Sequence, residues 1–174
     1  MNKQMENDSK YLSYLLRHHP EDAKCTIDEY GWVDVDTLVT NSKFSLEYLK
    51  EIVKNDTRYT FSDDFKKIRA FHGHSIKGII YQNEEIPPTY LYHGTSLENY
   101  EKIKQSGFIK GMSRTQVHLS ISEENAKKIG ARHGKPIVLK INCEAMINDG
   151  FKFYMSGDGV WLTSDIPIKY IMSN

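Results

Sequence analysis

Apolar residues recur every three or four positions in the first segment of the chain, which is the spacing of an amphipathic helix. The pattern begins after Asp8 or Ser9, either of which can act as an N-cap, and it continues through Leu12 and Leu16. It closes at Pro20, because proline cannot continue a helix. The sequence therefore predicts a helix from about residue 9 to residue 19.

Two further helices and a hairpin are predicted in the next fifty residues. Asp34 or Asp36 can start a short helix, and Ser45 can cap another whose apolar residues again share one face. Residues 58–61 and 67–71 read as two short strands around a polar turn, which indicates a hairpin. Three helices followed by a hairpin is the element order of a winged helix, although a fold alone does not define a function.

The pattern changes after Pro87 and Pro88, neither of which can continue a helix or donate to a strand ladder. Beyond them, strands are predicted at residues 90–93, 117–119, 136–141 and 159–163, and helices at about 97–106 and 123–131, the first ending at Gly107 and the second capped by Ser122. The sequence thus predicts an α+β chain of two lobes, residues 1–86 and 87–174.

Charge and composition narrow the possible functions. The 23 basic and 23 acidic side chains cancel, and the halves differ only modestly, with 12 basic and 15 acidic residues in 1–85 against 11 and 8 in 86–174. A general nucleic-acid binder would carry a larger basic excess, so any RNA is expected to be held at a few phosphates by particular arginines. No apolar run approaches the length of about 20 residues that a membrane helix needs, and the first residues lack the apolar core of a signal peptide. We expect a cytoplasmic protein with no membrane association.

The cysteines and histidines do not indicate a metal. Cys25 and Cys143 are isolated from each other, and no Cys/His group has the spacing of a zinc site. Buried, reduced cysteines with packing roles are the simpler interpretation. The sequence predicts that no metal is needed.

Four clusters of polar residues are the candidates for chemistry. They are Arg17-His18; Lys67-Ile68-Arg69 with Gly73-His74-Ser75; His93-Gly94-Thr95; and Arg114 with Val117–Ser120 and Gly130–Gly134. Each has an ordinary structural interpretation when taken alone: a basic last helical turn, a solvated strand arginine, a buried histidine or a surface arginine. Strand alternation does place Arg69 on the opposite face from Ile68 and Ala70.

The third cluster is the most informative one. His93-Gly94-Thr95 ends a predicted strand, and its glycine permits close approach of a ligand to the backbone. His93-Gly94-Thr95 and His118-Leu119-Ser120 also form two His-x-Thr/Ser pairs, which phosphodiesterases of the two-histidine type use as general acid and base. The interval between the pairs is short for strands that face each other across one cleft of that fold. On the residues alone, both interpretations stay open.

Taken together, the clusters resemble the NAD-dependent RNA 2′-phosphotransferase family, whose eukaryotic members finish tRNA splicing. The resemblance runs from Ser9 to Tyr170 and rests on order and spacing as well as on residue type. The matching stretches are Ser9–His18, Gly31–Val33, Ile68–Ala70, Gly73–Ser75, Leu91–Thr95, Val117–Ser120, Gly130–Pro136 and Gly159–Thr163. Departures lie beside these motifs, at His19, His72, Gln116 and Asp158.

The resemblance implies a fold and a set of site residues. It implies an N-terminal winged-helix lobe on the RNA side and a C-terminal ADP-ribosyltransferase-like lobe that binds NAD. The catalytic Arg-His-Arg-Arg set of the family corresponds to Arg17, His18, Arg69 and Arg132, with Arg114 as the competitor for the last place. By similarity the residues that touch NAD are His93, Gly94, Thr95, His118, Ser120 and Val160, and those that touch RNA phosphate are Lys67, His74 and Arg114. Protein-modifying relatives usually have a glutamate where Val160 stands, which argues against ordinary protein ADP-ribosylation.

The resemblance also implies a reaction in two steps. The 2′-phosphate of an RNA attacks the anomeric carbon of the nicotinamide ribose of NAD, and nicotinamide leaves. The 2″-hydroxyl of the attached ADP-ribose then attacks phosphorus, which releases 2′-hydroxyl RNA and ADP-ribose 1″,2″-cyclic phosphate. NAD is thus a co-substrate, the partner is an RNA that carries a 2′-phosphate, tRNA-like or other, and we expect a monomer. The alternatives are the two-histidine RNA phosphodiesterase and a winged-helix RNA-binding module without catalysis.

Overall fold

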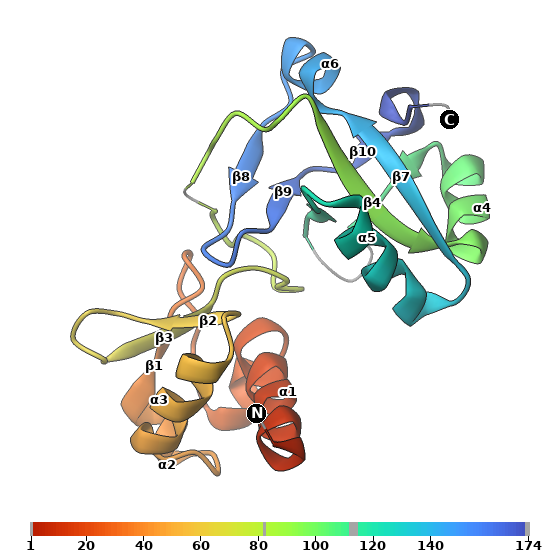
Figure 1. Ribbon diagram of the computed structural model, residues 1–174. Coiled ribbons are helices and arrows are strands. Elements are labelled where there is room, and N and C mark those ends of the chain that lie inside the picture. The colour runs from red at the N-terminus through yellow and green to blue at the C-terminus, as the bar shows by residue number, and fades with distance from the viewer. Residues whose placement is uncertain (1, 82, 112–114, 173–174) are drawn as a thin grey trace. The chain divides into compact units, whose positions relative to one another are not determined.

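The computed structural model describes residues 2–81, 83–111 and 115–172 (Figure 1). The chain divides into two compact units, Met1–Tyr81 and Gln82–Asn174. Each unit combines helices with antiparallel strands and has its own apolar core. The prediction of an α+β chain is therefore confirmed.

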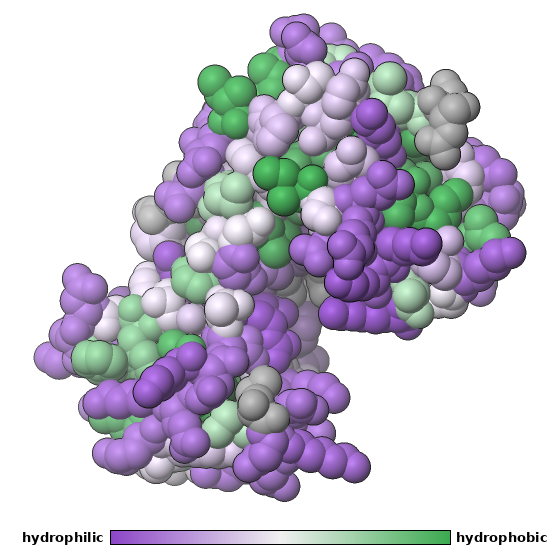
Figure 2. Space-filling model, viewed as in Figure 1, coloured by the Kyte–Doolittle hydropathy of each residue, from purple (hydrophilic) through white to green (hydrophobic). Residues whose placement is uncertain are grey.

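The first unit contains three helices and a small sheet. Its elements are α1 (Lys3–Arg17), η1 (Pro20–Ala23), β1 (Val33–Asp34), α2 (Val35–Thr40), α3 (Leu46–Asn55), β2 (Tyr59–Phe61) and β3 (Lys67–Ala70). The strands are antiparallel in the order β1-β3-β2, so β2 and β3 form the predicted hairpin. Ile68 and Ala70 are buried while Arg69 is half-buried on the other face, as strand alternation predicted. Figure 2 shows mostly hydrophilic residues on the visible face of this unit.

The start of α1 differs from the sequence prediction. The side chain of Asn2 caps the helix by accepting a hydrogen bond from the Met5 N–H at 2.8 Å, so the helix begins six residues before Ser9, at Lys3. Asp8 and Ser9, the predicted caps, lie within the helix and are buried. The prediction was wrong because aspartate and serine are favoured both as caps and as partners in buried polar networks.

Both residues make tertiary hydrogen bonds instead. Asp8 accepts hydrogen bonds from Lys43 and from the hydroxyl of Tyr48, the latter at 2.8 Å, and the Lys43 bond is the main cause that lowers the pKa of Asp8 to about 2. The Ser9 hydroxyl donates to Asp56 Oδ2 at 2.5 Å and accepts from Arg58 Nη2 at 2.8 Å. These bonds join α1 to α3 and to the residues that lead into β2, and they fix how the helix lies on the unit.

The second unit is built around β4 and β7. Its elements are β4 (Tyr90–Ser96), α4 (Leu97–Ser106), β5 (Phe108–Ile109), β6 (Val117–Leu119), α5 (Glu123–Gly130), η2 (Ala131–His133), β7 (Pro136–Asn142), α6 (Cys143–Asn148), β8 (Phe153–Met155), β9 (Trp161–Thr163), β10 (Ile166–Pro167) and η3 (Ile168–Tyr170). β4 and β7 pair over seven residues, and β6, β9 and β8 form a second antiparallel sheet. A bridge between Tyr92 and Ser120 connects the two sheets through two backbone hydrogen bonds of 2.8 Å.

Local signals set the ends of the helices in this unit as they do in the first. Ser122 caps α5, and Gly107, at a φ of 78°, ends α4, both as predicted. The strand predicted at residues 159–163 is shorter, because Gly159 and Val160 belong to the turn that enters β9. Sequence patterning missed α6, which is only six residues long, and β8, which has three.

Two glycines allow α5 to pack directly on β4. A Cβ at Gly94 would lie 1.7 Å from the carbonyl oxygen of Ala126 in α5, and one at Gly130 would lie 2.5 Å from the carbonyl oxygen of Thr95. Neither contact could be relieved by moving a side chain, because both involve backbone atoms. The absence of side chains at these two positions therefore brings helix and strand into backbone contact.

The backbone contact between β4 and α5 predicts that a methyl group added at Gly94 destabilises the second unit. Gly94→Ala should lower the free energy of unfolding of the second unit by at least about 3 kcal/mol, because backbone must move to admit the Cβ. Gly150→Ala is the matched control: its φ is +91° with nothing near the added Cβ, so only backbone strain of about 1–2 kcal/mol is expected. Denaturant unfolding followed by circular dichroism compares the two variants. Equal losses would show that crowding against α5 is not what requires glycine at residue 94.

Candidate functional site

The end of α1 places two of the predicted catalytic residues next to residues 73–75. Arg17 is the last residue of the helix and only 6% exposed, and His18 is its C-cap. The Ser75 N–H donates to the carbonyl oxygen of Arg17 at 3.0 Å, and the Ser75 hydroxyl lies 2.9 Å from His18 Nδ1. A Cβ at Gly73 would lie 3.2 Å from Arg17 Nη1, and φ there is +85°. The Gly73-His74-Ser75 motif thus holds the Arg17-His18 motif in place.

A tight turn over residues 28–32 holds the third predicted catalytic residue, Arg69. Its guanidinium carbon lies 4.5 Å from the centre of the Trp32 ring, and Nη1 donates to the carbonyl oxygen of Tyr30 at 3.2 Å. Asp28 Oδ1 accepts from the N–H groups of Tyr30 and Trp32 at 3.0 and 2.9 Å, which fixes the turn. Sequence reasoning had included Trp32 only as part of a motif and had missed Asp28 and Tyr30.

Arg69 keeps hydrogen-bonding capacity for a ligand. Its Nε is buried and has no hydrogen-bond partner among the described residues. Burial lowers the pKa of Arg69, while the negative charge of Asp28 opposes this change. Because an arginine stays protonated in proteins, the side chain presents a fixed positive charge with an uncommitted donor.

His74 is buried near Arg17, His18 and Arg69. It is 1% exposed, and a Cβ at Gly31, in the turn that holds Arg69, would lie 3.1 Å from its Nε2. Its Nδ1 lies 3.2 Å from the hydroxyl of Tyr81. Burial, together with the smaller effects of the charges of Arg17, His72, His18 and Arg69, lowers the pKa of His74 to about 3. His74 is therefore neutral at pH 7, so it adds no positive charge for an RNA phosphate.

Arg17, His18 and Arg69 therefore lie within electrostatic range of one buried, neutral imidazole. Arg17 and Arg69 provide permanent positive charge, and His18 provides a group that can titrate. Lys67, a predicted phosphate contact, is exposed in β3, with its Nζ 3.4 Å from Asp28 Oδ2. A group of guanidinium and imidazole side chains fixed in this way is suited to an anion such as a phosphate.

The second unit brings together most of the residues predicted to contact NAD. Nδ1 of His93 in β4 lies 3.1 Å from the carbonyl oxygen of His118 in β6, and Ser120 forms the bridge to the residue before His93. Leu119 pairs with Trp161 in β9, which places Val160 just before that pair. Burial lowers the pKa of His93, so its imidazole is mainly neutral at pH 7. Residues far apart in the sequence thus meet on three neighbouring strands.

Gly94 packs against the backbone of α5, and Arg132 lies in the turn that follows this helix. The backbone of α5 covers the side on which a Cβ of Gly94 would lie, so glycine is required for helix packing, whereas a close ligand approach had been expected. Arg132 is exposed in η2, two residues after Gly130, which itself contacts the backbone of Thr95. Arg114, the competitor for its role, lies outside the described residues.

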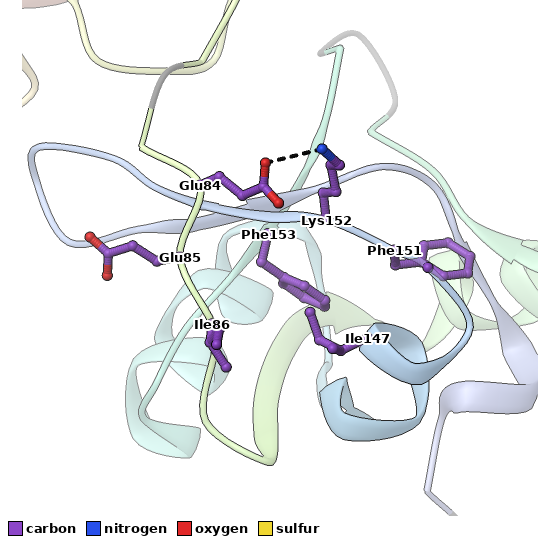
Figure 3. A pocket seen from close by; sticks show the side chains of 8 residues that line it. Glu84, Glu85, Ile86, Ile147, Phe151, Lys152 and Phe153 are labelled. Carbon is purple, nitrogen blue, oxygen red and sulfur yellow. Dashed lines mark hydrogen bonds and ion pairs between the residues drawn. The ribbon is translucent and has the colours of Figure 1, made fainter.

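A separate open pocket of about 450 Å³ occurs in the second unit (Figure 3). Its lining residues are Glu84, Glu85, Ile86, Ile147, Gly150, Phe151, Lys152 and Phe153. The ring of Phe153 and the side chain of Ile147 form an apolar wall, and an ion pair of 3.1 Å joins Glu84 to Lys152 at the rim. None of the predicted site residues lines this pocket.

Within residues 2–81, 83–111 and 115–172, no three histidine, cysteine, aspartate or glutamate side chains lie together as a metal would require. The helices of the same residues include none with the length and apolar character needed to span a bilayer.

The arginine and histidine side chains near His74 are of the kind that proteins use to bind phosphate groups. Comparison with known proteins then gives the family. The profile of the "RNA 2'-phosphotransferase, Tpt1 / KptA family" matches residues 3–165. The chain belongs to this family of RNA 2′-phosphotransferases, which confirms the resemblance found in the sequence and its identification as an enzyme.

Relatives from several bacteria match over nearly the whole chain. One from Fusobacterium nucleatum is 43% identical over 178 residues, covering 96% of this chain and 99% of the relative. One from Flavobacterium johnsoniae is 44% identical over 170 residues, covering 94% and 93%, and one from Escherichia coli is 37% identical over 177 residues, covering 97% and 96%. Each of them is named "Probable RNA 2'-phosphotransferase".

The buried neutral state of His74 predicts a pH dependence of stability. An unfolded histidine binds its proton near pH 6.5 and folded His74 only near pH 3, so the unfolded state binds more protons between these values. As pH falls through this window, the free energy of unfolding should drop by up to about 1.4 kcal/mol per pH unit on account of His74. Denaturant titrations of the wild type and His74→Gln at pH 7, 6, 5 and 4 isolate this contribution, because other groups are common to both. Parallel curves would contradict the assignment.

Proposed function

We propose that this enzyme removes an internal 2′-phosphate from RNA by passing it to the ADP-ribose part of NAD. The observation that supports this most is the arrangement of Arg17, His18 and Arg69 around the buried His74, because fixed guanidinium groups beside a titratable imidazole suit phosphate transfer. The family supplies the reaction type. In this proposal Arg17, His18, Arg69 and Arg132 are the catalytic residues.

The proposal assigns one role to each lobe. Residues 1–86 act as a winged-helix lobe that holds the RNA, which three helices and a β2–β3 hairpin support. Residues 87–174 act as an ADP-ribosyltransferase-like lobe that holds NAD. His93 in β4 contacts His118 in β6, and β6 pairs with β9, which begins directly after Val160; this arrangement supports the second assignment.

In the first step the phosphate oxygen forms a bond to the anomeric carbon of the nicotinamide ribose, and the bond to nicotinamide breaks with its electron pair. A 2′-phosphate is already an anion at neutral pH, so this step needs no strong base. What it needs is alignment of the two reactants. Arg17 and Arg69 hold the phosphate oxygens, and the fixed turn over residues 28–32 keeps Arg69 in one orientation.

NAD suits the polar groups that the second unit offers. The neutral imidazole of His93 is held by its Nδ1 contact with His118, which leaves Nε2 for a ribose hydroxyl. The indole N–H of Trp161 and the side-chain carbonyl of Gln116 are buried with no hydrogen-bond partner in the described residues. Trp161 is the first residue of β9 and follows Val160, and Gln116 precedes β6, which carries His118. Buried polar atoms of this kind indicate a polar ligand that satisfies them.

In the second step the ribose 2″-hydroxyl oxygen bonds to phosphorus, and the RNA 2′-oxygen leaves and takes up a proton. Charge increases on the phosphate oxygens in this transition state, so guanidinium groups assist most here. His18 is the residue placed to hold a proton beside the phosphate, since Ser75 fixes its Nδ1 and its ring can titrate. Arg132 contributes from the end of α5.

The two-histidine phosphodiesterase is less well supported. That mechanism uses two imidazoles as acid and base around one phosphate. Nδ1 of His93 is already engaged by the backbone of His118, and the family match assigns transfer of the phosphate.

The overall reaction can be tested in one incubation. An oligonucleotide with one internal 2′-phosphate should lose it only when NAD is added, and it should do so fully in EDTA. Mass spectrometry should show nicotinamide and ADP-ribose cyclic phosphate in equal amounts with the dephosphorylated RNA. Equal turnover without NAD would contradict the proposal and favour the phosphodiesterase.

A variant of Arg69 should separate the two steps. Arg69→Ala removes a donor that acts mainly when charge develops on phosphorus, so we expect the second step to slow by about 10²–10³ and the first step by less. A single-turnover time course with labelled RNA should then show a species heavier by one ADP-ribose. Arg69→Lys is the matched control, because it keeps the charge but loses the planar fork. If Arg69→Ala slows both steps equally, Arg69 is a binding residue only.

A further inference from the structure

Tyr11, Tyr14 and His19 form a row of rings on the outer side of α1 and just beyond its end. The rings of Tyr11 and Tyr14 are 6.3 Å apart and within 15° of parallel, and the His19 ring lies 4.7 Å from Tyr14. At the other end of the row, the Tyr11 ring lies 5.9 Å from that of Phe44, which is a buried core residue. Tyr11 is 36% and Tyr14 is 38% exposed. The core face of the same helix is filled by leucines, and the tyrosines lie outside that buried face.

The row leads to the catalytic end of the helix. Tyr11, Tyr14 and His18 stand at positions i, i+3 and i+7 of α1, which is the spacing of one helical face. The helical rise puts Tyr11 about 10 Å from His18, about the length of three stacked nucleotides at about 3.4 Å each. An RNA strand whose phosphate lies at His18 therefore has exposed rings beside its next nucleotides.

Polar contacts hold these rings at the surface. The hydroxyl of Tyr14 donates to Asp22 Oδ2 at 2.6 Å, and Lys43 lies 5.2 Å from the centre of the Tyr11 ring. His19 Nδ1 is 3.0 Å from Glu21 Oε1. The rings are thus oriented before any ligand binds, which lowers the entropy lost on binding.

We propose that Tyr11 and Tyr14 form a stacking platform for the bases next to the 2′-phosphorylated nucleotide. This inference rests on the proposed function, which places the phosphate at Arg17 and His18. Every base has a planar face, so the platform favours single-stranded RNA without selecting a sequence. Charge adds little to RNA binding at the platform. Lys43 is paired with Asp8 at one end of the row, and the acidic residues Glu21 and Asp22 lie at the other end. The contribution of the platform should therefore depend weakly on salt, unlike that of the arginines.

Substrate length is the variable that tests the platform. Three RNAs carry the same 2′-phosphate: a trinucleotide whose two outer nucleotides are abasic, a nonamer, and a nonamer whose flanking nucleotides are abasic. For the wild type we expect kcat/KM to rise about fivefold or more for each stacked base. The abasic nonamer should behave like the trinucleotide. Repeating the series at 50 and 300 mM salt should leave the ratio of nonamer to abasic nonamer nearly unchanged.

Paired variants separate stacking from structure. Tyr14→Leu and Tyr14→Phe both lose the bond to Asp22, but only phenylalanine keeps a ring, so Tyr14→Phe should retain the advantage of the nonamer and Tyr14→Leu should lose it. Tyr11→Leu should act in the same direction. Tyr90→Leu is the control, because Tyr90 is also 36% exposed and has Lys140 over its ring at 4.2 Å in the other unit. Turnover of the trinucleotide should stay unchanged in all four.

The outcomes are distinct from those that test the proposed function. If no RNA is dephosphorylated in the presence of NAD, the proposed function fails. If the wild type is active but gains nothing from flanking bases, or if both leucine variants keep the full gain, the platform is overturned and the rings serve local packing or a protein contact. Thermal unfolding of each variant shows whether a loss reflects a folding defect, and a folded Tyr14→Leu that loses only the length advantage supports the platform.

Discussion

The burial of a positive guanidinium at the last turn of α1 is the constraint on which the first unit's site depends. A helix C-terminus favours a cation, but Arg17 is only 6% exposed, so its charge must be accommodated by close neighbours. Gly73 leaves room for the side chain by having none of its own. The chain around Gly73 then runs along the end of the helix, which brings Ser75 to both the Arg17 carbonyl and the His18 ring. One buried charge thus determines the path of the segment that orients the neighbouring histidine.

Several positive groups near one another would repel, and the structure limits that cost in two ways. His74 stays neutral because it is buried, so it separates the charged groups without adding a charge. Arg69 lies over the face of Trp32, where the ring's electrons attract the cation. Donors that are fixed before the phosphate arrives need no reorganisation in the transition state, which is where catalysis gains most from electrostatics.

The sequence predicted most of the elements because their signals are local. Ser45, Ser122 and Gly107 act as caps through their own neighbours, and the hairpin follows from two short strands around a polar turn. Asp8 and Ser9 were misassigned because their tertiary partners lie from 35 to 50 residues away, and nothing in the local pattern distinguishes a buried network from a cap.

The same limit applies to the candidate site. Arg17, His18 and Arg69 were found because they stand in motifs, whereas the carbonyl of Tyr30 that accepts from Arg69 belongs to a residue 39 positions away and carries no side-chain signal. At Gly94 the residue type was informative but its partner was not. A glycine in a strand suggests that a ligand approaches the backbone, and in the structure the backbone of α5 lies there. The sequence showed which residue types the candidate site contains. The structure was needed to show which groups contact each of them, and from which side.

The segment before β4 has a consequence for how this protein behaves at high concentration. Asn83 and Glu85 pair with β8, where the carbonyl oxygen of Asn83 accepts from Met155 and the N–H of Glu85 donates to Phe153. β8 is the outer strand of its sheet, so this pairing occupies backbone groups that would otherwise be open to a strand from another molecule. The two glutamates at positions 84 and 85 add negative charge along that border. Proteolytic cleavage or shortening of this segment would uncover a sheet edge, and aggregation through edge-to-edge association would follow sooner than loss of the fold.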